Sequence, residues 1–157
     1  KVLPETILCY FAQQILDALE YMHKCKIIHN DIKPGNIVVD ANLDIKITDF
    51  SVSCTYANFD QEDCVEFPFM GTSKYICPEI LGHTHMKVKE ACKIDLYSLG
   101  VTLYELAFGK YPYNLSEVEN KNYDKILDNI KNEKLDTEDK LKKSSQQKYR
   151  YGRRVDL

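Results

Sequence analysis

Two short polar segments hold the residues best suited to chemistry. In residues 29–36, His-Asn-Asp-Ile-Lys-Pro-Gly-Asn, an acid, a cation and an amide stand at Asp31, Lys33 and Asn36. A second acid, Asp49, lies in Thr-Asp-Phe-Ser. One carboxylate can accept a hydroxyl proton, the ammonium can stabilise a moving phosphoryl group, and the amide with the other carboxylate can hold Mg²⁺ through oxygen ligands. The set is therefore suited to chemistry on a phosphate.

Short strands and one helix are expected around these segments. Apolar residues recur every three or four positions over residues 4–23, which predicts an amphipathic helix. Residues 27–28 are a β-branched run, and 37–39 and 45–47 flank a polar turn, which predicts short hairpin strands.

The second half of the chain mixes loops with helices. Residues 54–70 lack periodicity and are predicted to form a loop. Residues 95–108 are apolar on nearly every face, which is typical of a buried helix, and Gly109 should end it. A further helix is expected within 117–132, and the charged tail 136–157 is expected to be loosely ordered.

Length and composition set limits on the class of protein. The chain has 157 residues, which suits one domain, and its net charge of −3 attracts neither nucleic acid nor an anionic membrane. No apolar run is long enough for a membrane span and no leader is evident, so we expect a cytoplasmic location without a membrane partner. Six cysteines without a Cys-x-x-Cys pair indicate free, buried thiols rather than a zinc site or a disulfide framework.

Four motifs in order resemble those of protein kinases. Residues 29–36 resemble the catalytic loop, Asp-Phe-Ser at 49–51 the magnesium-binding Asp-Phe-Gly, and 71–79, Gly-Thr-Ser-Lys-Tyr-Ile-Cys-Pro-Glu, the segment ending in Ala-Pro-Glu. Asp-Leu-Tyr-Ser-Leu-Gly at 95–100 resembles the start of the central helix. Residues 47–50 and 104–113 are most similar to the AGC group, and the residue after Asp-Phe is similar to the YANK branch.

This resemblance implies the roles of the polar residues. Asp31 matches the catalytic base and Lys33 the phosphate-stabilising lysine of Ser/Thr kinases, while Asn36 and Asp49 match the Mg²⁺ ligands. The implied activity is transfer of the ATP γ-phosphate to Ser or Thr of a protein substrate.

Other positions match binding residues of the family. Val38 matches the floor of the adenine site, and Thr48 a residue beside the nucleotide. Thr72 matches a threonine that ties the substrate loop to the base and the lysine. Glu105 matches an AGC position that meets a basic substrate side chain, although a salt bridge or surface role is an equal alternative.

Several residues keep a structural interpretation beside the functional one. His29 is expected to be a packed, hydrogen-bonded core residue. Asp95 is first an N-cap candidate, to which the resemblance adds a role in bracing the backbone of the catalytic loop. Glu79 should pair with an arginine that remains unassigned.

The departures from the family pattern are informative. The sequence has no glycine-rich loop, no strand lysine and no helix-C glutamate, and Asn30 stands where an arginine usually precedes the catalytic acid. All three arginines lie at or after position 150, so a phosphate on Ser53, Thr55 or Tyr56 would lack the bidentate partner that normally orders this loop. The sequence therefore argues against control by phosphorylation there. Ser51 in place of glycine also restricts the backbone.

The fold expected is mainly α (α+β): the C-terminal lobe of a protein kinase with a small β-hairpin at the catalytic loop and without the N-terminal lobe. Residues 1–135 would form this partial kinase domain and 136–157 a separate tail. A Ser/Thr kinase is the favoured function. A non-catalytic relict that serves as a docking module and a fragment of a longer active kinase are the alternatives, and the oligomeric state is left open.

Overall fold

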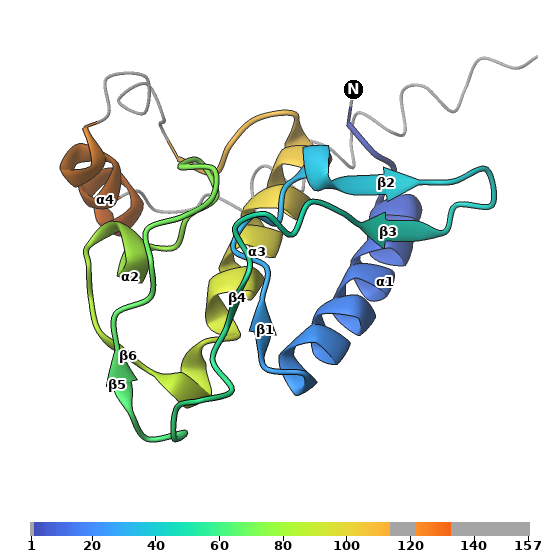
Figure 1. Cartoon of the computed structure of the whole chain (residues 1–157). Coiled ribbons are helices and arrows are strands. Elements are labelled where there is room, and N and C mark those ends of the chain that lie inside the picture. The colour runs from blue at the N-terminus through green and yellow to red at the C-terminus, as the bar shows by residue number, and fades with distance from the viewer. Residues whose placement is uncertain (1, 114–121, 133–157) are drawn as a thin grey trace, which may run out of the picture.

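The computed structural model describes residues 2–113 and 122–132 (Figure 1). The tail expected at 136–157 lies outside the described residues. The helices are α1 (Glu5–Lys24), α2 (Pro78–Leu81), α3 (Lys93–Phe108) and α4 (Tyr123–Asn132), with short 3₁₀ turns at Pro34–Asn36 and Val88–Glu90. The strands are β1 (Ile27–Ile28), β2 (Ile37–Val39), β3 (Ile45–Ile47), β4 (Cys54–Thr55), β5 (Cys64–Val65) and β6 (Met86–Lys87).

Helix α1 confirms the prediction from periodicity, displaced by one residue at each end. Pro4 directly precedes it, and its buried face consists of Phe11, Ile15, Leu19 and Met22. This face packs on α3, β1 and β3. The apolar spacing therefore fixes which side of α1 meets the elements that carry the candidate site.

Strands β2 and β3 form the expected antiparallel hairpin, in which Ile37 faces Ile47 and Val39 faces Ile45. The carboxylate of Asp40 closes the turn by accepting hydrogen bonds from two backbone N–H groups of the turn, at 2.8 and 3.0 Å. Gln14 of α1 bonds this turn, donating to the Leu43 carbonyl and accepting from the amide of the first β3 residue, both at 3.0 Å. The closed end of the hairpin is thereby attached to α1.

The loop predicted over 54–70 is wrong in part, because two short strands lie within it. Strand β4 pairs with β1, and β5 pairs with β6. Each strand is only two residues long, which is too short to show an alternating pattern, and each partner is distant in sequence. The pairing of β4 with β1 places the segment after Asp49 beside the strand that leads into the catalytic loop (Figure 1).

Helix α3 ends as predicted, and its burial is less complete than predicted. Gly109 adopts a left-handed conformation with φ 67° and its N–H bonds the Glu105 carbonyl, which terminates the helix. Leu96, however, is 43% exposed, so one face of α3 is open in the described residues. The N-cap prediction for Asp95 is also wrong, since the helix begins at Lys93 and Asp95 is its third residue. Helix α4 confirms the helix expected within 117–132.

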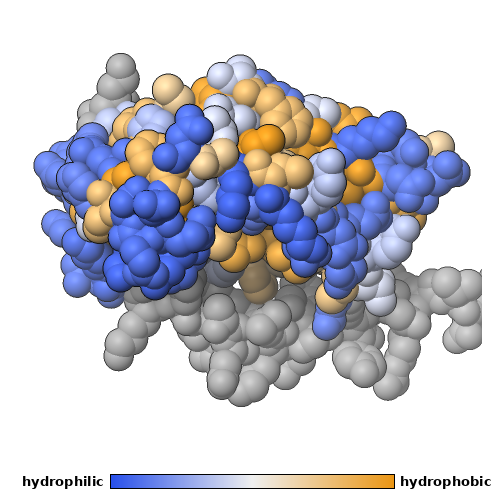
Figure 2. Space-filling view, turned by 60° about the horizontal axis from the view of Figure 1, so that its bottom comes forward, coloured by the Kyte–Doolittle hydropathy of each residue, from blue (hydrophilic) through white to orange (hydrophobic). Residues whose placement is uncertain are grey.

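Two clusters of buried side chains make up the core. One joins α1 to the catalytic loop and α3, through Ile15, Leu19, Met22, Ile32 and Leu99. The other surrounds α2 and the β5–β6 pair and includes Ile126 of α4. Hydrophobic side chains also reach the surface between hydrophilic ones (Figure 2).

The cysteines are free thiols, as predicted, but the expectation that they are buried is wrong for most of them. Only Cys77 is buried, whereas Cys9, Cys25 and Cys64 are exposed. None of the described helices is long and apolar enough to cross a membrane.

Candidate active site

Asp95 fixes the backbone at the start of the catalytic loop. Its fully buried carboxylate accepts hydrogen bonds from the backbone N–H groups of His29 at 2.9 Å and Asn30 at 3.0 Å. The ring of His23 on α1 lies 2.9 Å from the same carboxylate. The bracing role implied by the family resemblance is thus present in the geometry, and α1, α3 and the loop meet at one side chain.

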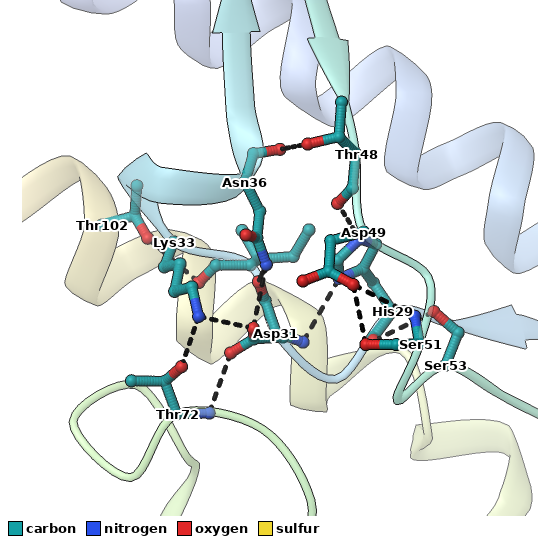
Figure 3. Close-up of polar contacts among 11 residues, drawn as sticks. His29, Asp31, Lys33, Asn36, Thr48, Asp49, Ser51, Ser53, Thr72 and Thr102 are labelled. Atoms are coloured by element: carbon teal, nitrogen blue, oxygen red, sulfur yellow. Dashed lines mark hydrogen bonds and ion pairs between the residues drawn. The ribbon is translucent and has the colours of Figure 1, made fainter.

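His29 connects the two polar segments and is a packed structural residue, as expected. It is fully buried, and its Nε2–H donates to the Thr48 carbonyl at 3.1 Å. Its Nδ1 accepts from the backbone N–H of Asp31 at 3.3 Å. The His29 ring therefore contacts both the loop of Asp31 and the segment of Asp49 (Figure 3).

Asp31 lies at the centre of a dense set of polar contacts (Figure 3). The Lys33 ammonium lies 2.7 Å from its Oδ2, and the Asn36 amide donates to the same oxygen at 2.9 Å. Its Oδ1 accepts from the backbone N–H of Thr72 at 2.8 Å, while Lys33 also donates to the Thr72 hydroxyl at 2.6 Å. The structure therefore brings together four of the predicted residues, Asp31, Lys33, Asn36 and Thr72.

These contacts favour the ionised form of Asp31. Burial raises the pKa of the Asp31 carboxyl, but hydrogen bonds from Lys33, Thr72 and Asn36 and the charge of Lys33 outweigh burial and leave the pKa below its usual value. Asp31 is accordingly a carboxylate at neutral pH and able to accept a proton.

Asn36 and Asp49 supply oxygen atoms suited to a divalent cation. The side-chain nitrogen of Asn36 donates to the backbone carbonyl and to the carboxylate of Asp31. The side-chain oxygen of Asn36, Oδ1, is therefore the atom able to bind a metal. Asp49 is exposed, and its Oδ1 accepts from the Ser51 hydroxyl at 2.7 Å and the Ser51 N–H at 3.3 Å. These hydrogen bonds lower the pKa of Asp49 below its usual value.

Two protein ligands of this kind fit Mg²⁺ that is shared with phosphate oxygens. Within residues 2–113 and 122–132, no group of three or more His, Cys, Asp or Glu side chains is placed to hold a metal. Mg²⁺ commonly takes one or two carboxylates together with waters and substrate phosphates, and it prefers hard oxygen ligands. The amide oxygen of Asn36 and the carboxylate of Asp49 are ligands of this kind.

Val38 and Thr48 lie on the hairpin beside the catalytic loop. Val38 is 51% exposed, in the middle of β2. The Thr48 N–H and hydroxyl both donate to the backbone carbonyl of Asn36, at 2.9 and 3.2 Å. Thr48 thereby joins the open end of the hairpin to the 3₁₀ turn. Val38 therefore offers an apolar surface, and Thr48 acts on the backbone next to Asn36.

Glu105 belongs to a separate set of contacts on α3. It accepts a 2.6 Å hydrogen bond from the hydroxyl of Tyr75, which also lies 3.3 Å from that of Tyr111. Burial and the hydrogen bond to Glu105 raise the pKa of the Tyr75 phenol. Glu105 thus holds the segment after Thr72, through a contact with Tyr75 that no local sequence pattern indicates.

Gly71 is a site residue whose role the sequence did not indicate. A Cβ at this position would lie 2.1 Å from the Asn30 carbonyl oxygen, and its φ of 99° favours glycine. The close approach allows the following residue, Thr72, to reach Asp31. The glycine at the start of 71–79 was the available signal, but its partner lies 41 residues earlier.

Comparisons of the sequence with known proteins identify the family of the chain. The family model described as "Protein kinase domain" matches residues 1–151. The chain is 39% identical over 126 residues to the cell cycle serine/threonine-protein kinase CDC5/MSD2 of Saccharomyces cerevisiae, covering 80% of this chain and 17% of that protein. It is 33% identical over 129 residues to the serine/threonine-protein kinase plk-2 of Caenorhabditis elegans, covering 82% and 19%.

Another relative is mitogen-activated protein kinase kinase 1c of Physcomitrium patens, 40% identical over 122 residues, covering 76% of this chain and 33% of that protein. The chain spans 12% to 33% of the length of the curated relatives named here and those matched beside them. These relatives carry the names of several kinds of kinase, so they support the family without selecting the AGC group or the YANK branch. On the match over residues 1–151, together with the catalytic-loop geometry, the chain belongs to the protein kinase family.

Proposed function

We propose that the described residues carry the catalytic half of a protein kinase that transfers the γ-phosphate of ATP to Ser or Thr of a protein substrate. The observation that carries the proposal is the arrangement of Asp31, whose carboxylate contacts Lys33, Asn36 and the Thr72 amide at 2.7–2.9 Å. This arrangement combines a fixed base with a cation beside it, which is what phosphoryl transfer to a hydroxyl requires.

In the proposed reaction, Asp31 accepts the proton of the substrate hydroxyl. Lys33 lies between Asp31 and the Thr72 hydroxyl, so its charge is available to phosphate oxygens while Thr72 fixes its position. Because Asn36 and Thr72 donate to different oxygens of Asp31, the carboxylate cannot rotate without breaking a bond on either side. Positioning of this kind typically contributes 10² to 10⁴ in rate for a general base.

Asn36 and Asp49 would hold Mg²⁺, which would supply positive charge to the phosphates when bound. His29 maintains the distance between the two ligand-bearing segments through its bonds to Asp31 and Thr48. Val38 and Thr48 would lie toward the nucleotide.

We further propose that residues outside the described part complete the nucleotide site. Val38, Val39 and Phe50 are 51%, 41% and 51% exposed, and they lie on or next to the hairpin that carries Asn36 and Asp49. In this proposal the described residues are the C-terminal lobe, and a second lobe covers these apolar side chains. A cytoplasmic location belongs to the same proposal.

The finer substrate class rests on Lys33 and Glu105. A lysine two residues after the base is the Ser/Thr arrangement of the family, and two of the three relatives named above, those of Saccharomyces cerevisiae and Caenorhabditis elegans, carry Ser/Thr kinase names. An AGC-like use of Glu105 would direct a basic substrate residue toward α3, next to the bond between Glu105 and Tyr75.

A non-catalytic docking module is the second candidate. The exposed apolar side chains of the hairpin favour it, because they would serve a partner protein as well as they would serve a second lobe. This candidate predicts that binding survives the loss of Asp31.

The deciding experiment measures phosphate transfer from ATP to protein Ser and Thr, using a form that carries a nucleotide-binding lobe before residue 1. Asp31→Asn should lower kcat by about 10² to 10⁴. The matched control is Asp44→Asn in the exposed hairpin turn, which should retain full activity. Substantial turnover by Asp31→Asn would refute the role of the base, and transfer to Tyr instead of Ser or Thr would refute the substrate class.

A further inference from the structure

Asn30 is buried at the junction of three segments of the chain. It is 5% exposed, and its backbone has a φ of 66°, a left-handed conformation that asparagine tolerates better than most residues. Its N–H is bonded to Asp95, and its carbonyl oxygen lies against Gly71. The direction of its side chain is therefore fixed by the backbone on both sides.

The carboxamide of Asn30 bonds to the segment that follows Asp49. Its Nδ2 donates to the Val52 carbonyl at 3.1 Å and to the Cys54 sulfur at 3.3 Å, so one side chain contacts this segment at two points. Neither contact is used by the proton transfer or the Mg²⁺ ligands proposed above.

The neighbouring hydrogen bonds between the same two parts of the chain also join uncharged groups, beside a contact of the Lys26 ammonium with the Tyr56 ring at 5.7 Å. The Ser53 hydroxyl donates to the His29 carbonyl at 3.2 Å, and the Thr55 hydroxyl and Tyr56 N–H donate to the Lys26 carbonyl at 3.2 and 3.0 Å. The antiparallel pairing of β1 with β4 adds backbone hydrogen bonds between the same two parts. Residues 52–56 are thus attached to residues 26–30 by neutral hydrogen bonds.

We propose that Asn30 is a positioning residue: its carboxamide holds the segment of Asp49 against the loop of Asp31, so that the two halves of the site stay in register without a phosphate on residues 53–56. The proposal rests on the proposed function for its catalytic consequence. The attachment itself depends only on the contacts of Asn30 with Val52 and Cys54.

Amide hydrogen exchange of the whole chain tests the attachment. Asn30→Gly removes the carboxamide and accommodates the positive φ, so backbone strain does not confuse the result. Exchange in residues 50–57 should accelerate about tenfold, as expected for the loss of two buried hydrogen bonds, while residues 11–22 of α1 keep their rate. Asn42→Gly, in the exposed hairpin turn, is the matched control and should leave both rates unchanged.

An unchanged rate over 50–57, or equal acceleration of both peptides, would overturn the proposal. Cys54→Ala removes one acceptor while Asn30 remains, and it should accelerate exchange over 50–57 by a smaller factor. This second variant decides the question if Asn30→Gly does not fold, because an unchanged rate there would also overturn the attachment.

Paramagnetic broadening by Mn²⁺, used in place of Mg²⁺, tests the register in the form that carries a nucleotide-binding lobe, with ATP present to supply the phosphate oxygens. In the wild-type chain, Mn²⁺ should broaden the amide signals next to Asn36 and Asp49 over the same concentration range. In Asn30→Gly, the Mn²⁺ concentrations that broaden the signals next to Asn36 and next to Asp49 should differ by several-fold, an effect that a merely structural residue would not produce. If both sets of signals still broaden over the same Mn²⁺ concentrations, the positioning role is refuted. Absence of broadening in the wild type would refute the proposed metal site, while hydrogen exchange would still decide the attachment.

Discussion

Replacement of Asp95 by Ala should weaken the fold around the catalytic loop more than the loss of one surface carboxylate would. Asp95 is fully buried, and its removal leaves the backbone N–H groups of His29 and Asn30 without their acceptor in a site where these residues are 0% and 5% exposed. An unsatisfied buried donor costs about 1–3 kcal/mol, so two of them cost about 2–6 kcal/mol. The bond with His23 is lost as well.

Urea denaturation followed by far-ultraviolet circular dichroism measures this effect. The free energy of unfolding should fall by about 4 kcal/mol, a large part of the about 5–15 kcal/mol typical of a domain. Asp95→Asn retains one oxygen acceptor and should lose about half as much. The control Asp17→Ala, on the exposed face of α1, should change stability by no more than about 0.5 kcal/mol. A loss below about 1 kcal/mol in Asp95→Ala would show that water or backbone movement satisfies these donors and would refute the reasoning.

The other predictions concern the loop itself. Gly71→Ala should displace its segment from Asn30, because the added Cβ would lie 2.1 Å from a backbone oxygen at a φ of 99°. A change in the chemical shift of the Thr72 amide cross-peak in NMR spectra would report this displacement, and an unchanged spectrum would contradict it. Lys33→Met should raise the pKa of Asp31, which hydrogen bonds including that of Lys33 now hold below its usual value. In the wild type, ionised Asp31 stabilises the fold above the ordinary Asp pKa of about 3.9, and this contribution is lost as the pH falls through the lowered pKa. In Lys33→Met the loss should begin at higher pH, and ¹³C NMR titration of the carboxyl carbon would check it; an unshifted titration would show that Lys33 does not stabilise the carboxylate.

The parts of the fold that follow from local pattern could be predicted from the sequence. The apolar spacing of α1 and the glycine at the end of α3 are signals carried by residues within one or two turns of each other. The spacing of Asp31, Lys33 and Asn36 within one loop likewise indicated that their side chains could meet, and they do.

The remaining features depend on residues that are distant in sequence. Asp95 looks like a helix cap to a local reading, yet its partners lie 65 and 66 residues earlier. Glu105 has its partner 30 residues away at Tyr75, and the two-residue strand β4 acquires its identity only from β1. Such contacts have no local signature because the tertiary fold, and not the neighbouring sequence, brings the partners together.

The β2–β3 hairpin also offers a place to attach a reporter. Its open end carries Asn36 and the residues leading to Asp49, whereas its closed end is held by Gln14 and Asp40. Because the strand register is set by three residue pairs between these ends, a change at the exposed tip, between positions 41 and 42, is separated from the polar site by the whole ladder. A fluorophore attached to a side chain there would move with the hairpin while staying clear of Asn36 and Asp49.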